Sequence, residues 1–191
     1  PMNVSASTTL TEDITCPETA VNIIANNLVL DCNGYSINYS SSGVGNGINA
    51  TARTNITIQN CNVLTENGSV VDSDAITFSG TNNSFLLNTN ATSNASIAIN
   101  LTGSNNNTLT GINATSGTVY GIFLSASSNN TLANSTMNTL GPTDTNIGIL
   151  VESSSSNNTI TNNTIRTNGT SNNFGLKIQT SSSDNNVTNN T

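Results

Sequence analysis

Apolar and polar positions alternate in short runs along the chain, and no segment offers a helical face of useful length. Residues 55–60 (NITIQN), 121–125 (GIFLS), 148–152 (GILVE) and 175–179 (GLKIQ) repeat with a period of two. This period is typical of short strands that bury one face. The pattern therefore predicts many short β-strands separated by polar corners.

The strands recur as a repeat. A small residue followed by an aliphatic one returns after 28, 23, 23, 27 and 27 residues, with the aliphatic residue at Ile48, Ile76, Ile99, Ile122, Ile149 and Leu176. A second anchor follows an asparagine-rich turn at Leu30, Ile58, Phe85, Leu109, Leu132, Ile160 and Val187. A weaker third column, five residues later, contains Val63, Ala114, Met137 and Ile165, with Asn90 as an exception. Two columns with matching periods indicate a repeated structural unit.

A unit of 23–28 residues cannot bury its apolar residues alone, so the units must stack. Coiling the chain so that each unit lies one strand spacing above the last gives three parallel sheets around an aliphatic interior. We therefore expect an all-β, right-handed parallel β-helix of about seven coils with three short strands each. It forms one domain over residues 1–191, with 1–25 as a capping first coil and 26–191 as repeated coils. A β-sandwich, the alternative, does not explain the two aligned columns.

Asparagine recurs at the corner after the second anchor. Three residues beyond that anchor the chain has Asn33, Cys61, Asn88, Ile112, Ser135, Asn163 and Asn190. Asparagine tolerates left-handed backbone angles at tight bends. Stacked asparagine side chains can also bond to one another along the rod. We expect corner geometry to be the main role of this column.

Asparagine can also carry a glycan. Eighteen asparagines begin an Asn-X-Ser/Thr acceptor sequence: Asn3, Asn38, Asn49, Asn55, Asn67, Asn82, Asn90, Asn94, Asn100, Asn106, Asn113, Asn129, Asn134, Asn157, Asn162, Asn168, Asn186 and Asn189. Many of them arise from composition alone, but every exposed one is a candidate site in a secreted chain. An asparagine inside a ladder cannot carry a glycan, so we expect sugars on outward strands and loops.

Charge is sparse. Ten acidic and three basic residues give a net charge of −7, and the cations are Arg53, Arg166 and Lys177. This count excludes a nucleic-acid footprint and a polybasic membrane anchor, which need clustered Lys and Arg. No apolar run approaches the roughly 18 residues that span a bilayer, so we expect no membrane insertion.

The three cysteines are Cys16, Cys32 and Cys61. With no CxxC pair and no histidine in the chain, a zinc or redox motif is unsupported. Cys32 and Cys61 follow successive anchors and fall near each other on neighbouring coils, while Cys16 and Cys32 form the other plausible pair. Either bridge would suit an oxidising compartment.

Residues 14–37 (ITCPETAVNIIANNLVLDCNGYSI), 47–63 (GINATARTNITIQNCNV) and 148–165 (GILVESSSSNNTITNNTI) resemble the right-handed parallel β-helix repeat proteins. The NosD-like and archaeal cell-surface members are the most similar in character. The resemblance implies an extracellular surface protein that is often glycosylated. A copper role is not supported, because Met2, Met137 and three cysteines make no soft-metal site, and we expect no cofactor.

The only close acidic pair is Asp72 and Asp74. Their i, i+2 spacing would place both carboxylates on one face of a strand, suited to general acid and base work or to a calcium ion. The structural alternative is a solvated loop end before Ile76. Polysaccharide hydrolases and lyases of this fold resemble one another in needing basic partners near the acids. This chain has no histidine and no cluster of cations, so we expect it not to be an enzyme.

A carbohydrate-binding adhesin or stalk is a further alternative, although aromatic platforms are sparse, with Tyr35, Tyr39, Tyr120 and four phenylalanines. The last coil stops at Thr191 without a cap, which exposes a row of backbone donors and acceptors. Such an end either continues into more chain or stacks on another subunit, head to tail. Our hypothesis is a secreted, N-glycosylated surface-layer or filament subunit that assembles by end-to-end stacking.

Overall fold

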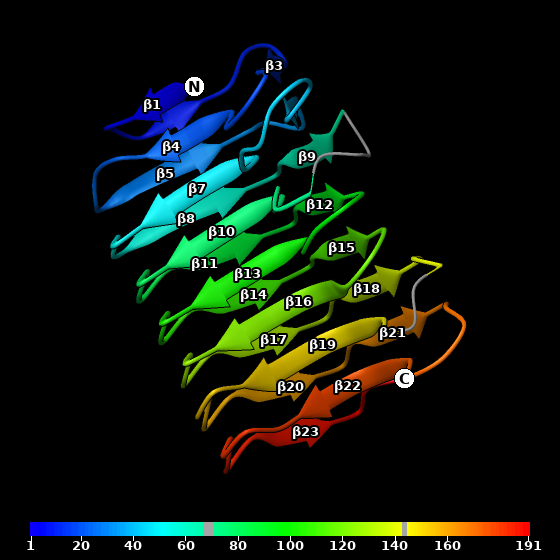
Figure 1. The fold of residues 1–191 in the computed structure, drawn as a ribbon. Helices are drawn as coiled ribbons and strands as arrows, with labels where there is room; N and C mark the ends of the chain where they lie inside the picture. The colour runs from blue at the N-terminus through cyan, green and yellow to red at the C-terminus, as the bar shows by residue number, and fades with distance from the viewer. Residues whose placement is uncertain (67–70, 143–144) are drawn as a thin grey trace.

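The computed structural model describes residues 1–66, 71–142 and 145–191. Within this part of the chain all regular structure is β-strand, and the strands coil into a rod with the N-terminal coil at one end and the C-terminal coil at the other (Figure 1). Among the described residues, each coil but the last gives one strand to each of three parallel sheets, and the last gives strands to two of them. The predicted parallel β-helix is therefore confirmed.

Sheet A has the strand order β1-β4-β7-β10-β13-β16-β19-β22. Its strands are β1 (Met2–Val4), β4 (Val21–Ile23), β7 (Ile48–Thr51), β10 (Ile76–Ser79), β13 (Ile99–Thr102), β16 (Tyr120–Ser125), β19 (Ile147–Glu152) and β22 (Phe174–Ile178). Sheet B comprises β2 (Thr8–Thr9), β5 (Leu28–Asp31), β8 (Ile56–Gln59), β11 (Phe85–Leu87), β14 (Thr108–Thr110), β17 (Thr131–Ala133), β20 (Thr159–Thr161) and β23 (Asn186–Thr188). Sheet C comprises β3 (Ile14–Thr15), β6 (Ser36–Tyr39), β9 (Asn62–Thr65), β12 (Asn90–Ser93), β15 (Asn113–Ser116), β18 (Thr136–Thr139) and β21 (Thr164–Thr167).

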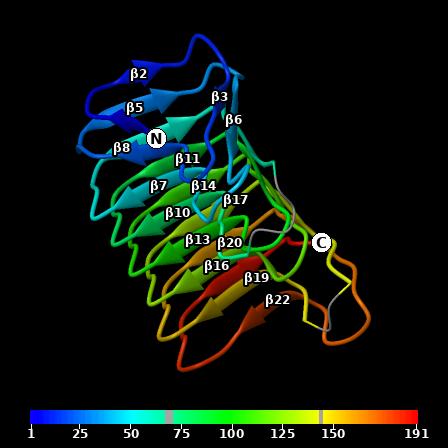
Figure 2. The same cartoon turned by 45° about the horizontal axis from the view of Figure 1, so that its top comes forward.

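Sheets A and B lie face to face, and sheet C closes one side of the rod (Figure 2). The first predicted column is confirmed, because Ile48, Ile76, Ile99, Ile122, Ile149 and Leu176 are direct neighbours across sheet A. All but Leu176 are buried. Burial of one aliphatic side chain contributes about 1.5–3 kcal/mol. Stacking thus supplies the apolar burial that one coil lacks.

The second predicted column is wrong at one position. Leu86, and not Phe85, pairs with Ile58 and Leu109. Leu86 is fully buried, whereas Phe85 is 43% exposed on the outer face of sheet B. Because neighbouring residues of a strand point to opposite faces, only one of the two can face inward. The same shift removes the Asn90 exception, since Ala91 pairs with Val63 and Ala114 in the third column.

The corner between sheets B and C is a left-handed residue in every coil after the first. These residues are Asn33, Asn60, Asn88, Gly111, Asn134, Asn162 and Asn189, with φ between 47° and 67°. The predicted corner column is therefore one residue late in several coils. Cys61, Ile112, Ser135 and Asn163 are buried instead of turning the chain. The left-handed residue points its side chain to solvent, so the residue after it faces the interior.

Polar ladders run along the rod inside the corners. The backbone N–H of Asn107 donates to Oδ1 of Asn130 (2.9 Å), and the N–H of Asn130 donates to Oδ1 of Asn158 (2.9 Å). A hydroxyl ladder in the neighbouring position links Thr81, Ser104, Ser127, Ser155 and Ser182. A buried backbone group without a partner costs about 1–3 kcal/mol. The ladders satisfy these groups where the sheets are interrupted.

The turn from sheet C to sheet A requires a small residue. A Cβ on Gly148 would lie 2.1 Å from Cγ2 of Ile165, and one on Gly47 would lie 2.2 Å from Cγ1 of Val63. Where the third-column residue is Ala91 or Ala114, the small position of the same coil is alanine rather than glycine. The two positions therefore compensate each other in volume.

Candidate functional site

The acceptor asparagines lie on the outside of the rod. Asn67 lies outside the described residues, and none of the other seventeen acceptors is buried. Asn38, Asn49, Asn82 and Asn100 are half-buried, and the remaining acceptors are exposed. The buried asparagines form a separate set, none of which begins an acceptor sequence: Asn107, Asn130, Asn146, Asn158 and Asn163. Asparagines that hold the fold and asparagines that could carry sugar are thus different residues.

At the corners this separation has a local cause. Asn129 is exposed with a φ of 59°, Asn130 is buried in the ladder, and Thr131 begins β17. A left-handed corner favours asparagine, the ladder position needs an amide, and the start of a strand favours a β-branched residue. Residues 106–108 and 157–159 repeat this order. Corner geometry therefore favours acceptor sequences at the surface of the rod.

Three acceptors, Asn3, Asn49 and Asn100, lie on the strands of sheet A, where no corner requires asparagine. Asn49 and Asn100 point outward beside the threonines of their own acceptor sequences. The Thr51 hydroxyl donates to Oδ1 of Asn49 (3.0 Å), and the Thr102 hydroxyl donates to Oδ1 of Asn100 (3.0 Å). Because residues i and i+2 share one strand face, the amide and the hydroxyl meet in the folded rod.

Asp72 and Asp74 do not lie on a strand, so the predicted shared strand face is wrong. They lie in the bend before β10, where Asp72 is exposed with a φ of 58° and Asp74 is half-buried. Asp74 accepts hydrogen bonds from the Ser96 hydroxyl (2.7 Å) and from Nδ2 of Asn100 (2.9 Å). It therefore ties its loop to the next coil. Among the described residues, no group of three or more His, Cys, Asp or Glu is placed to hold a metal ion.

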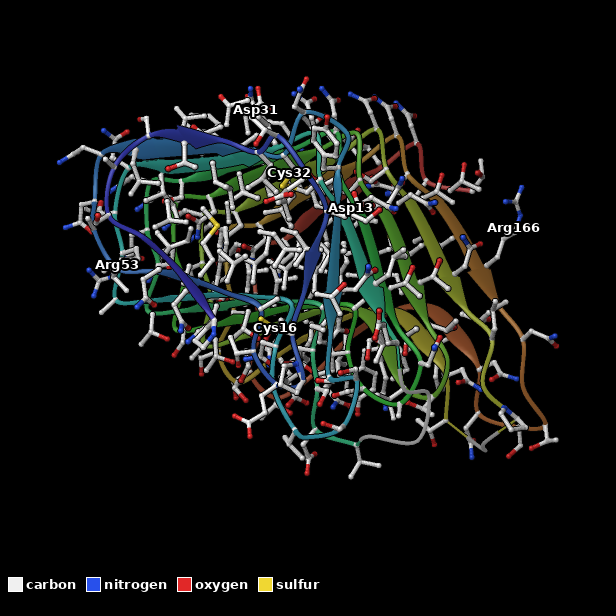
Figure 3. All side chains as sticks on the ribbon, turned by 90° about the horizontal axis from the view of Figure 1, so that it is seen from above. Asp13, Cys16, Asp31, Cys32, Arg53 and Arg166 are labelled. Carbon is white, nitrogen blue, oxygen red and sulfur yellow. A yellow bond between two sulfur atoms is a disulfide. The ribbon has the colours of Figure 1, made fainter. Side chains whose placement is uncertain are left out.

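The cysteines resolve the two pairings left open. Cys32 and Cys61 form a disulfide between neighbouring coils, with their Cα atoms 4.8 Å apart. Cys16 is a free, half-buried thiol. Figure 3 shows Cys16 on the side of the rod opposite Cys32. The disulfide links the two coils near the corner between sheets B and C.

Three of the seven aromatic residues gather on the outer face of sheet A. Tyr120 and Phe123 of β16 stack with ring centroids 5.5 Å apart and planes 28° apart. On β22, Phe174 is 40% exposed, and Nζ of Lys177 lies 5.1 Å from the centre of its ring. Sequence reasoning missed this grouping, because two coils separate Tyr120 from Phe174. The missed signal is local: both residues come directly before a glycine-aliphatic anchor.

An apolar layer lies between these aromatic residues. Ile147 pairs with Tyr120 and Phe174 on its two sides, and Leu150 pairs with Phe123 and Lys177. Ile147 is 1% exposed and Leu150 is 2% exposed, yet neither belongs to the interior apolar cluster of the rod. The flanking side chains therefore form a second, outer apolar cluster over β16, β19 and β22.

Polar groups border the outer cluster. Nε2 of Gln179 donates to Oε2 of Glu152 (2.7 Å) at the end of β19. Burial, together with the negative charge of Glu152, raises the pKa of the Tyr120 hydroxyl above its usual value. This hydroxyl therefore remains protonated at neutral pH and can donate a hydrogen bond. The arrangement joins aromatic rings to a carboxylate, an amide and a phenol.

A family model described as a right-handed β-helix region matches residues 41–191. The chain belongs to the right-handed β-helix family. The match establishes the handedness of the coil and does not distinguish NosD-like or archaeal cell-surface members. No curated protein matches the chain.

The cations of this β-helix are far apart. Arg53 and Arg166 lie on opposite sides of the rod (Figure 3), and Lys177 lies on β22. Arg53 borders a shallow hollow of about 310 Å³ with Asn22, Ile24 and Asn49. Its guanidinium donates from Nη1 to the Ile24 carbonyl (3.0 Å), which links neighbouring coils. The described residues include no α-helical segment with the length and apolar character of a membrane span.

Proposed function

We propose that this β-helix is an extracellular structural rod that carries N-linked sugars and serves as a surface-layer or filament subunit. The observation that carries the proposal is the division of the asparagines, with acceptors outside and ladder residues inside. Charged residues make up only 7% of the chain, well below the usual quarter. Sugars on the outward acceptors would supply the solvation that charge supplies elsewhere.

The disulfide supports the location. Disulfides persist in oxidising compartments and are rare in the cytosol. The Cys32–Cys61 bridge is therefore consistent with a cell-surface protein. The same compartment is the one in which glycosylated surface proteins function.

Charge supports head-to-tail assembly. Four carboxylates lie in the first two coils, at Glu12, Asp13, Glu18 and Asp31, whereas two of the three basic side chains, Arg166 and Lys177, lie on the outermost strands β21 and β22. At the C-terminal end Arg166 and Lys177 offset Glu152 and Asp184, so the N-terminal end is the more negative of the two. This difference favours one direction of contact between copies. A head-to-tail contact of this kind builds filaments.

Native material provides the test of this proposal. We expect enzymatic release of N-glycans to convert acceptor asparagines to aspartate, which mass spectrometry of peptides detects, and the five buried asparagines serve as internal negative controls. Electron microscopy should show rods joined end to end. Native chains that carry no sugar on any acceptor asparagine and stay monomeric would contradict both parts.

We further propose that the protein is not an enzyme. Asp74 is held by the Ser96 hydroxyl and the Asn100 amide, and no histidine is available as a general base. The check is polysaccharide turnover by the purified protein, compared with Asp72→Asn and Asp74→Asn variants. Cleavage that either variant abolishes would overturn this part of the proposal.

A further inference from the structure

The outer face of sheet A changes character along the rod. Its central outward column begins with Asn22, Asn49, Thr77 and Asn100 and continues with Phe123, Leu150 and Lys177. The inward columns stay apolar along the rod, with Phe78 between the aliphatic residues Ala50 and Leu101. The backbone register therefore does not require the aromatic residues of β16 and β22.

We propose that this face binds a neutral oligosaccharide. The site, called the aromatic face below, comprises Tyr120, Phe123, Leu150, Glu152, Phe174 and Gln179. It goes beyond the structural role proposed above and requires neither glycosylation nor assembly. Its ligand is a chain of uncharged sugar rings that lies along the rod, from β16 to β22.

The rings supply the apolar half of the recognition. A pyranose ring presents C–H groups on its flat face, and these pack against the face of an aromatic ring. Tyr120 and Phe123 stack on each other with their centroids 5.5 Å apart, so each ring keeps one face that the other does not cover. Phe174 lies two strands away, a distance of about 10 Å. Ile147 and Leu150 of β19 lie between the rings of β16 and β22 and are buried, so they fill the space between the rings.

The border supplies the polar half. Sugar hydroxyls both donate and accept, so their site needs both kinds of group. Glu152 has a second carboxylate oxygen, and Gln179 has an amide oxygen, neither of which is used by the bond between them. The protonated Tyr120 hydroxyl can donate. Lys177 beside Phe174 balances the charge of Glu152, so the face carries no net charge of its own. The net charge of −7 on the whole chain repels acidic sugars, so the ligand is neutral.

Two observations separate this ligand from a covering by protein or by the rod's own sugars. No acceptor asparagine lies on β16, β19 or β22, whereas Asn3, Asn49 and Asn100 lie on earlier strands of the same sheet. Three strands of five or six residues present on the order of 300 Å². A stable protein interface needs about 800 Å² from each partner. The size of the face suits a short sugar chain better than a second copy.

The test uses the full chain expressed without glycosylation, so that its outcome is independent of N-linked sugars. Titration calorimetry would measure binding of neutral hexasaccharides of β-1,4-glucose, β-1,4-N-acetylglucosamine and α-1,6-mannose, with trigalacturonate as the acidic comparison. We expect at least one neutral hexasaccharide to bind. Phe123→Asn introduces the residue type that Asn100 has at the paired position of the preceding coil, and it should weaken that affinity at least tenfold.

Two further variants keep the test decisive if Phe123→Asn unfolds. Glu152→Gln removes the charge at constant shape, and Tyr120→Phe removes only the hydroxyl; each should weaken binding several-fold. Phe85→Thr is the matched control, because Phe85 is an exposed aromatic residue on sheet B with threonine neighbours on both sides. It should leave affinity unchanged. Absence of binding to all three neutral sugars, preference for trigalacturonate, or a wild-type dimer that Phe123→Asn dissociates would overturn the proposal.

Discussion

The inward and outward sides of sheet A follow different rules. Inward, Ile76, Ile99 and Ile122 repeat one residue type from coil to coil. Outward, Asn100 is followed by Phe123 on the adjacent strand without any change in register. Stacking fixes the interior, because each inward side chain must fit those above and below it. The exterior is not packed against another sheet, so its residues can vary from coil to coil and are free to serve a ligand or a glycan. Changes inside should therefore affect stability, and changes outside should affect binding or modification.

Adjacent asparagines provide the largest test of this contrast. Asn130→Ala leaves the N–H of Asn107 without its acceptor and the Ser104 carbonyl without the Nδ2 donor of Asn130, both in a buried corner. At about 1–3 kcal/mol for each unpaired group, we expect a loss of roughly 2–5 kcal/mol in the free energy of unfolding. Urea denaturation followed by circular dichroism measures this change.

Asn129→Gly is the matched control. Asn129 is exposed in the left-handed region, which glycine adopts without strain. Its substitution should change stability by less than about 0.5 kcal/mol. Equal effects at the two positions would show that the ladder does not hold the corner.

Removal of the disulfide should cause the second-largest loss of stability. Cys61 occupies the inward position that Ser135 and Asn163 fill with ladder bonds in later coils. Replacing both Cys32 and Cys61 with serine removes a bridge across 29 residues, and we expect it to cost about 2–4 kcal/mol. Denaturation with and without reductant measures the loss, and Cys16→Ser serves as the control because Cys16 is free. A double variant as stable as the oxidised protein would contradict the expectation.

The turn from sheet C to sheet A gives the third effect. Gly148→Ala places a methyl group 2.1 Å from Cγ2 of Ile165 and 2.6 Å from the Gly175 carbonyl oxygen. Overpacking of this kind costs about 1–3 kcal/mol. Gly175→Ala makes the same chemical change at the equivalent position of the next coil, where the nearest atom to the new methyl group, Cγ2 of Ile165, lies 3.7 Å away. A melting temperature lowered by Gly148→Ala and nearly unchanged by Gly175→Ala is expected; the reverse order would refute volume matching.

These contrasts also explain what could be predicted from the sequence. Inward columns repeat because packing repeats, so Ile48 through Leu176 were aligned correctly from spacing alone. Phe85 was misplaced because two adjacent apolar residues compete for one inward position, and only the backbone register decides between them. The corner column was one residue late, because an exposed left-handed asparagine and a buried ladder asparagine look identical in sequence.

The outer cluster could not be predicted from the periodicity of the sequence. Its members Tyr120, Ile147 and Phe174 belong to three coils and meet only because β16, β19 and β22 stack in register. No rule of the repeat requires them, so no column contains them. The role of Asp74 was hidden for the same reason, since its partners Ser96 and Asn100 lie on the next coil. These contacts between side chains on different coils therefore could not be predicted from the repeat.

The smallest effect on stability should come from Asp31, an outward-facing residue at the end of β5 in sheet B. Its carboxylate accepts hydrogen bonds from the Gln59 amide (2.7 Å), the Asn60 amide (3.0 Å) and the backbone N–H of Asn33 (2.8 Å). These bonds, led by that from Gln59, lower the pKa of Asp31 below its ordinary value of 3.8. The ionised carboxylate therefore stabilises the fold above the pKa of the unfolded chain, about 4. That stability is lost as the pH falls through the lowered pKa of the folded state.

Asp31→Asn separates this outward contribution from the interior. The variant should melt slightly below the wild type at pH 7, by less than either interior variant, because exposed polar ties are screened by solvent. The difference should shrink as the pH falls below about 4, since the wild-type carboxyl then becomes neutral as well. Paired melting curves between pH 7 and pH 2 measure it. A difference that stays constant with pH would place the effect in shape rather than in charge, and a difference as large as that of Asn130→Ala would erase the contrast between the two sides of the coil.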